Sequence, residues 1–140
     1  MTAPHSPLTA AEVLAGGGWH PRYARVIALA SDDGYGFALV DGNGDGSELE
    51  AEHWTQWDGT WGCEASSGAG PLDHVGPIRT GGQTLCETAW FAYGSAPGRD
   101  AVTIAFDGGL HQVPVGEHGI WAFIAARPGR SGRDAPALAD

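Results

Sequence analysis

The sequence predicts an all-β fold: a two-sheet antiparallel β-sandwich of about eight strands, of the immunoglobulin-like or jelly-roll kind, with a short N-terminal helix. Glycine accounts for 23 of the 140 residues and proline for nine, which is typical of a chain that turns often. Between the glycine-rich turns, short apolar runs recur at nearly regular spacing, as in proteins built from many short strands. A β-barrel shares both features and is the competing arrangement.

The predicted helix lies near the N-terminus. Thr9 and Glu12 form a capping-box pair in front of Val13 and Leu14, and the glycines at 16–18 end the helix within about two turns. A helix this short is not stable alone, so we expect its apolar residues to dock on a sheet.

Four strands are expected in the first half of the chain. Asp33-Gly34 and Asp58-Gly59 lie between apolar runs, and Asp-Gly favours a two-residue hairpin turn because both residues tolerate positive φ. The expected strands are 23–30, 35–40, 47–53 and 61–65. The stretch 66–83 then breaks the pattern. We interpret it as a crossover between sheets, and a functional or disordered loop is the alternative.

The second half predicts four more strands, at 84–93, 101–106, 110–115 and 120–126. Asp107-Gly108-Gly109 is the turn between the middle pair, and Pro114 indicates an edge position or a strand end because proline cannot donate to a ladder. We expect residues 1–126 to form a single domain and residues 127–140 a flexible tail.

Charge and composition exclude several function classes. The net charge is −10, and the seven basic residues are all arginine, so the basic stripe that nucleic-acid binding needs is missing and an anionic membrane is disfavoured. The sequence contains no apolar run of about 18 residues. We expect a cytoplasmic protein, monomeric or homodimeric, in which Cys63 and Cys86 are reduced thiols that face each other in the core.

Residues 41–52 match the twelve-residue calcium-loop pattern at every fixed position and resemble the loop of the helix–loop–helix calcium family. The flanks predict strands instead of helices, and a strand over 47–53 places Ser47 and Glu52 about 16 Å apart, so Glu52 cannot curl back onto an ion. Glu48, Glu50 and Glu52 are expected to point outward from this strand. A reduced site remains, and calcium is the only cofactor that the sequence suggests. Its ligands would be Asp41, Asn43, Asp45 and Glu48. The alternative is an acidic turn without metal.

Three tryptophans surround the second Asp-Gly turn. Counting positions along the chain puts Trp57 and Trp61 on one face and Trp54 on the other. Trp54 and Trp57 lie nearest the turn and are the candidates for an exposed ligand-binding platform. Burial in the core is the alternative for both.

Asp73 and His74 in the 66–83 stretch are a candidate ligand-binding pair, and with Ser66 and Ser67 they are the best candidates for hydrolysis. The Gly-x-Ser-x-Gly elbow of a serine hydrolase is missing around these serines. We therefore expect no enzyme, no catalytic residues and no bound cofactor other than calcium.

The sequence as a whole favours a non-catalytic binding or interaction module with an unknown protein or small-molecule partner. One alternative is a calcium-supported domain that binds carbohydrate or another small ligand through its tryptophans. The other is a small hydrolase or tailoring enzyme that uses the 66–83 stretch.

Overall fold

The computed structural model of the chain describes residues 5–82, 89–126 and 135–139. It is an all-β, sandwich-like fold with one short N-terminal helix, α1 (Ala10–Gly16), which confirms the predicted fold class and helix. A 3-10 turn, η1, spans Leu72–His74. The described residues form the strands β1 (Arg25–Asp32), β2 (Tyr35–Asp41), β3 (Leu49–Trp57), β4 (Thr60–Gly70), β5 (Arg79–Gly82), β6 (Ala89–Ser95), β7 (Ala101–Phe106), β8 (Gly109–Pro114), β9 (Ile120–Ala126) and β10 (Ala137–Leu138).

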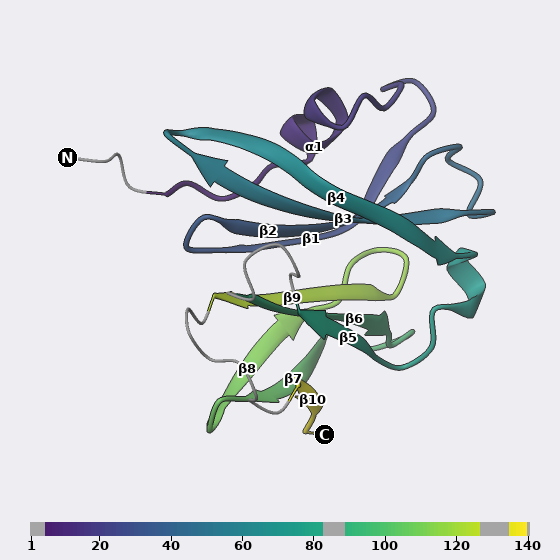
Figure 1. Cartoon of the computed structure of the whole chain (residues 1–140). Coiled ribbons are helices and arrows are strands. Elements are labelled where there is room, and N and C mark those ends of the chain that lie inside the picture. The colour runs from purple at the N-terminus through teal and green to yellow at the C-terminus, as the bar shows by residue number, and fades with distance from the viewer. Residues whose placement is uncertain (1–4, 83–88, 127–134, 140) are drawn as a thin grey trace.

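The strands form three antiparallel sheets, one more than predicted. Sheet A contains β1, β2, β3 and β4 in sequential order, sheet B has the order β5-β6-β9, and sheet C has the order β10-β7-β8. In Figure 1, α1 and the three sheets follow one another as layers from top to bottom. A separate cluster of buried side chains fills each gap between the layers.

The three Asp-Gly turns form as predicted. Each joins two strands through a two-residue loop, and both residues of each loop have positive φ: 47° and 85° at Asp33-Gly34, 52° and 81° at Asp58-Gly59, and 51° and 76° at Asp107-Gly108. This conformation matches the twist of the flanking strands. These turns therefore set the register of each strand pair next to the turn. The register then shifts once along β1–β2 and twice along β3–β4, and it stays constant along β7–β8.

The helix α1 has the predicted capping box, in which Thr9 accepts from the N–H of Glu12 and the Glu12 carboxylate accepts from the N–H of Thr9. Its buried side chain, Val13, belongs to the cluster that covers the outer face of sheet A. This cluster comprises Leu8, Val13, Ala24, Ala38, Val40, Trp54 and Trp61. The helix thus closes one face of the first sheet.

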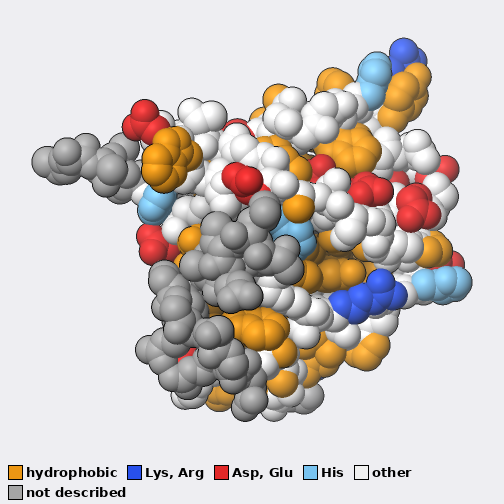
Figure 2. All heavy atoms as spheres, in the orientation of Figure 1, with side chains coloured by type: hydrophobic (Ala, Val, Ile, Leu, Met, Phe, Trp, Pro, Cys, Tyr) orange, Lys and Arg blue, Asp and Glu red, His pale blue; other side chains and the backbone are white. Residues whose placement is uncertain are grey.

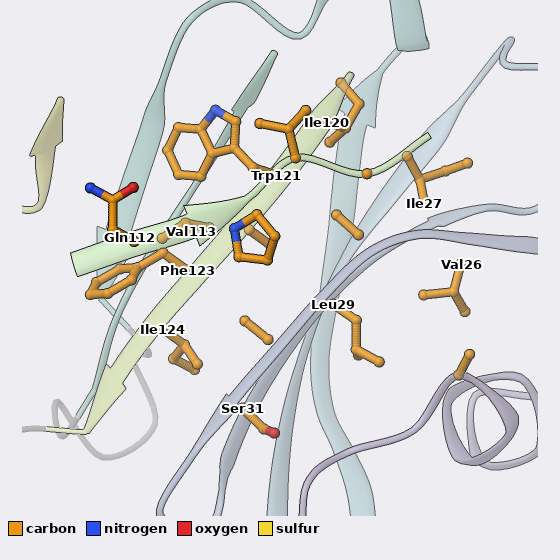
Figure 3. A pocket seen from close by; sticks show the side chains of 17 residues that line it. Val26, Ile27, Leu29, Ser31, Gln112, Val113, Ile120, Trp121, Phe123 and Ile124 are labelled. Carbon is orange, nitrogen blue, oxygen red and sulfur yellow. The ribbon is translucent and has the colours of Figure 1, made fainter. Parts of the chain in front are cut away.

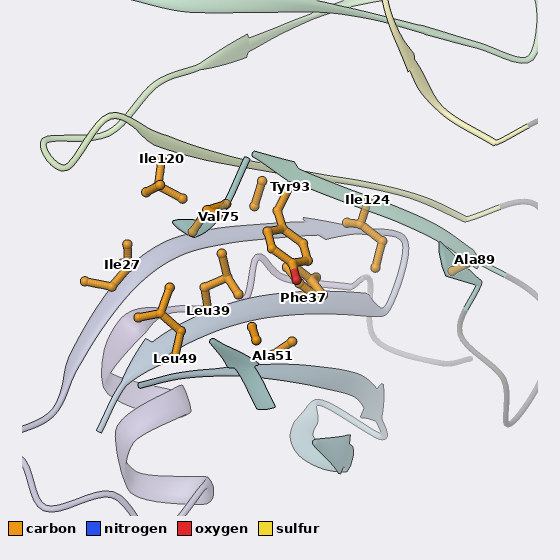
Figure 4. Close-up of a cluster of buried hydrophobic side chains, with 12 residues drawn as sticks. Ile27, Phe37, Leu39, Leu49, Ala51, Val75, Ala89, Tyr93, Ile120 and Ile124 are labelled. Atoms are coloured by element: carbon orange, nitrogen blue, oxygen red, sulfur yellow. The ribbon is translucent and has the colours of Figure 1, made fainter. Parts of the chain in front are cut away.

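The inner faces of sheets A and B meet in the largest cluster (Figure 4). Its centre is aromatic: Phe37 of β2 stacks on Phe91 and Tyr93 of β6, with ring centroids 4.7 and 5.4 Å apart. His53 of β3 lies against Phe37 and Phe91, its Nδ1 atom makes no hydrogen bond, and burial lowers the pKa of its ring.

Strand β9 is apolar on both faces, and this accounts for the presence of a third sheet. Ile120, Ala122 and Ile124 belong to the cluster shared with sheet A, whereas Trp121 and Phe123 belong to the cluster shared with sheet C. All seven residues of β9 are buried. A strand that is apolar on both faces needs cover on both sides, and the β7–β8 hairpin supplies the second cover. Pro114 ends the edge strand β8, as predicted.

Two expected irregular segments contain regular structure. In the stretch 66–83, β4 continues to Gly70 and β5 begins at Arg79, so the crossover from sheet A to sheet B is shorter than predicted. In the predicted tail, Ala137 and Leu138 pair with Ala105 and Ile104 of β7, so this part of the tail is a strand.

Acidic side chains dominate the charged surface. On the face seen in Figure 2 they gather mostly over the upper half, which sheet A and its loops form, and basic side chains are few. None of the helices in the part of the chain described here has the length and apolar content needed to cross a membrane.

Candidate functional site

A groove of about 560 Å³ lies where the edges of the three sheets come together (Figure 3). Strand β1 is an edge of sheet A, β9 an edge of sheet B and β8 an edge of sheet C. In the close-up, Val26 and Leu29 of β1 lie on one side of the groove, and Val113 and Phe123 lie on the other. The groove is lined by Ala10 and by residues 26–31, 112–116 and 120–124.

The groove lining is uncharged, although the chain carries a net charge of −10. The indole N–H of Trp121 is buried without a hydrogen-bond partner among the described residues, whereas the polar side chains of Ser31 and Gln112 have partners within the protein. The Ser31 hydroxyl accepts a hydrogen bond from the N–H of Leu8 at 3.1 Å, and the Gln112 amide donates to Thr103 Oγ1 at 2.7 Å. The groove therefore offers apolar side chains and strand backbone to a ligand.

The predicted metal loop connects β2 and β3, so strands flank it as expected. Asp41 is 3% exposed, and its two carboxylate oxygens accept the N–H groups of Gly44 at 3.0 Å and Gly46 at 2.7 Å. Asp45 accepts the N–H and the hydroxyl of Ser47, and these bonds lower the pKa of its carboxyl. Both carboxylates thus hold the turn in shape.

Asn43 and Glu48, the other two predicted ligands, are exposed residues of the same loop. Across the described ranges 5–82, 89–126 and 135–139, no group of three or more His, Cys, Asp or Glu side chains is arranged to hold a metal ion. Calcium binding therefore stays a prediction of the sequence.

Glu52 is a buried acidic residue, and the prediction that it points outward is wrong. It is 2% exposed instead of pointing to solvent, and its carboxylate accepts the indole N–H of Trp19 at 2.9 Å and of Trp54 at 3.2 Å. Burial raises the pKa of Glu52, and the two indole bonds oppose that rise. The predicted docking of the N-terminal helix on a sheet is the sequence feature that could have indicated this burial, because α1 covers the face of sheet A that carries Trp54.

The tryptophan platform is not formed. Trp54 is fully buried, whereas Trp57 is 85% exposed. Trp61 shares the buried cluster of Trp54, because Trp61 pairs with Gln56 across the turn and paired residues share a face. The prediction that Trp61 shares a face with Trp57 is therefore wrong. Only Trp57 remains a candidate for surface binding.

Asp73 and His74 lie in η1, with the His74 Nε2 atom 3.9 Å from an Asp73 carboxylate oxygen. Both side chains are largely exposed, at 83% and 74%, which is not the environment that tunes a catalytic acid or base. Ser66 and Ser67 are exposed residues of β4. Ligand binding by Asp73 and His74 stays a prediction.

Cys63 is an exposed free thiol, so its predicted core position is wrong. It lies on β4 opposite Trp54, near the end of the hairpin. Cys86 lies outside the described residues.

Comparison of the chain with protein-family models, with curated proteins and with solved structures finds no match in any of the three.

Proposed function

We propose that the protein is a non-catalytic binding module and that the groove between β1, β8 and β9 is its ligand site. One observation supports this most directly: the groove is an uncharged, apolar hollow in a chain of net charge −10. Its volume of about 560 Å³ falls within the range of known ligand sites. An apolar surface of this kind gains free energy when a ligand displaces water from it.

The chemistry of the lining favours binding over catalysis. The lining residues include no Asp, Glu, His or Cys, the side chains that supply most acid–base and nucleophilic groups. The Ser31 hydroxyl is engaged by the N–H of Leu8. The partner is therefore an uncharged apolar group of a small molecule or protein.

A neutral apolar dye tests the proposal. Nile red should gain fluorescence on binding, and Leu29→Gln should weaken binding about fivefold or more, because a polar amide then replaces an apolar contact in the groove. Leu110→Gln is the matched control, since Leu110 is 71% exposed on β8 and does not line the groove. Amide NMR shifts should change at residues 26–31 and 120–124.

Thermal melting of both variants establishes that they are folded before binding is compared. Dye binding that is absent, or that Leu110→Gln weakens as much as Leu29→Gln does, contradicts the groove as the ligand site.

A further inference from the structure

The buried carboxylate of Glu52 lies beneath a short segment, residues 18–23, that follows α1. Trp19 of this segment donates its indole N–H to one Glu52 oxygen at 2.9 Å, and Trp54 of β3 donates to the other oxygen at 3.2 Å. Trp19 is partly buried, whereas every other residue of 18–23 is exposed. Trp19 is therefore the one side chain that anchors this segment to sheet A.

Two glycines shape the place where the Trp19 ring lies. A Cβ atom at Gly42 would lie 2.6 Å from the ring, and a Cβ atom at Gly17 would lie 2.8 Å from it. Both distances are too short for a real contact, so only glycine leaves room for the ring at these two positions. Gly42 belongs to the loop between β2 and β3. The Trp19 ring thus contacts the end of α1 and this loop while it bonds β3.

The charge of Glu52 is not compensated by a basic side chain. Within residues 5–82, 89–126 and 135–139, Glu52 forms no ion pair, and the charge that acts on it comes from Glu50, a second acid. Cys63 on β4 stays a neutral thiol, because burial and the charge of Glu52 raise its pKa to about 11. His20 and Arg22 are exposed. The other acidic residues on the neighbouring elements accept hydrogen bonds from groups other than those that bind Glu52; they are Glu12, Asp41 and Glu64.

The position of the 18–23 segment is linked to the proton on Glu52. Burial raises the pKa of Glu52 while the segment covers it, whereas a hydrated carboxyl returns toward the usual value of 4.5. The covered state is therefore favoured while Glu52 is protonated, and this preference is lost as pH rises through the raised pKa. A neutral carboxyl keeps acceptor lone pairs for the indole N–H groups, so protonation is compatible with the covered state.

We propose that residues 18–23 form a pH-sensitive lid, which Trp19 holds closed over Glu52 while Glu52 carries its proton and which opens when Glu52 loses it. Because Trp19 also contacts Gly42, opening frees one side of the loop between β2 and β3. The clusters between the three sheets lie on the other side of sheet A, so the opening is local. The lid goes beyond the proposed function and does not depend on the groove.

Hydrogen exchange of the indole N–H groups, followed by NMR on the whole protein, tests the lid. Trp19→Phe identifies the Trp19 resonance. Its protection factor, which corrects for intrinsic exchange, should fall as pH rises above 4.5, by about tenfold for each unit by which the pKa of Glu52 is raised. It should level off at the pH where the carbon-13 shift of the Glu52 carboxyl titrates. Trp121 is the internal control, because it is 1% exposed in another cluster and should keep its protection.

Two substitutions separate Glu52 from its neighbour. Glu52→Gln has no proton to lose, so Trp19 protection should no longer depend on pH, whereas Glu50→Gln should keep that dependence. If Glu52→Gln does not fold, the agreement between Trp19 protection and the Glu52 titration in the unsubstituted protein decides. The lid is overturned if Trp19 protection stays level with pH, if Glu52→Gln keeps the dependence, or if Trp121 loses protection in parallel, which identifies global unfolding.

Discussion

The two ends of segment 41–52 hold carboxylates that the fold uses in different ways. Asp41, at the end of β2, accepts two backbone N–H groups and fixes the loop that follows it. Glu52, in the middle of β3, accepts two indole N–H groups and ties Trp19, which follows α1, to sheet A. One twelve-residue pattern therefore supplies two separate internal anchors, because the chain between them becomes a strand.

The comparison teaches that the backbone decides what a carboxylate pattern does. A calcium loop needs its first and twelfth residues on the same ion. Here both are almost fully buried, at 3% and 2% exposure, with all four of their oxygens accepting hydrogen bonds from the protein itself.

The largest effect is expected at the Glu52 end. Trp54→Ala removes a fully buried indole and one of the two donors to Glu52, so we expect the free energy of unfolding to fall by about 3–5 kcal/mol. Chemical denaturation measures this change. Trp57→Ala, at an 85% exposed position of the same strand, is the control and should change stability by less than about 0.5 kcal/mol. Similar losses for both variants would contradict the burial of Trp54.

A smaller effect is expected at the Asp41 end. Asp41→Ala leaves the N–H groups of Gly44 and Gly46 without their acceptor, and we expect a loss of about 2 kcal/mol in urea unfolding. Asp45→Ala is the control, because Asp45 is an exposed residue whose carboxylate bonds the neighbouring Ser47. If Asp45→Ala costs as much as Asp41→Ala, Asp41 is not the anchor of the loop.

Glu52 should also give stability a pH dependence of its own. Its raised pKa means that the folded state binds more protons than the unfolded state above the usual value of 4.5, so its contribution is fully present below that value and is lost as pH rises through the folded pKa. Glu52→Gln lacks this titration. The stability of the unsubstituted protein minus that of Glu52→Gln should therefore fall with rising pH, as followed by denaturation at a series of pH values. A difference that rises or stays level contradicts a raised pKa.

The smallest effect is expected from calcium. Because the oxygens of Asp41 already accept backbone N–H groups, millimolar calcium should shift the melting temperature by less than about 1 °C. Thermal melting with calcium and with a chelator measures this. A clear rise in Tm that Asp41→Ala abolishes would instead establish the loop as a metal site.

The parts of the fold that depend on neighbouring residues were predictable. The Asp-Gly turns and the capping box of Thr9 and Glu12 are local chemistry, and both formed as expected. The third sheet depends on which layer the β7–β8 hairpin covers, and that is a long-range choice. The apolar run of β9 was the available signal, because a strand exposed on one face alternates with polar residues.

The candidate site was harder to predict than the fold. The groove combines residues 26–31 with residues 112–116 and 120–124, which are far apart in the sequence and contain no motif. The burial of Glu52 likewise depends on Trp19 and the α1 cluster lying over β3. Most of the charged and aromatic candidates lie in surface loops and turns, whereas the groove is made of ordinary apolar strand residues.

The position of β9 has a consequence for how the chain can be divided. A fragment that ends within residues 71–78 would contain all of sheet A but would expose Ile27, Phe37 and Leu39, which β9 and β6 cover in the whole protein. The complementary fragment would expose Ile120 and Ile124. We therefore expect each piece to aggregate when it is made alone, and we expect a split version of this protein to assemble only when both pieces are co-expressed.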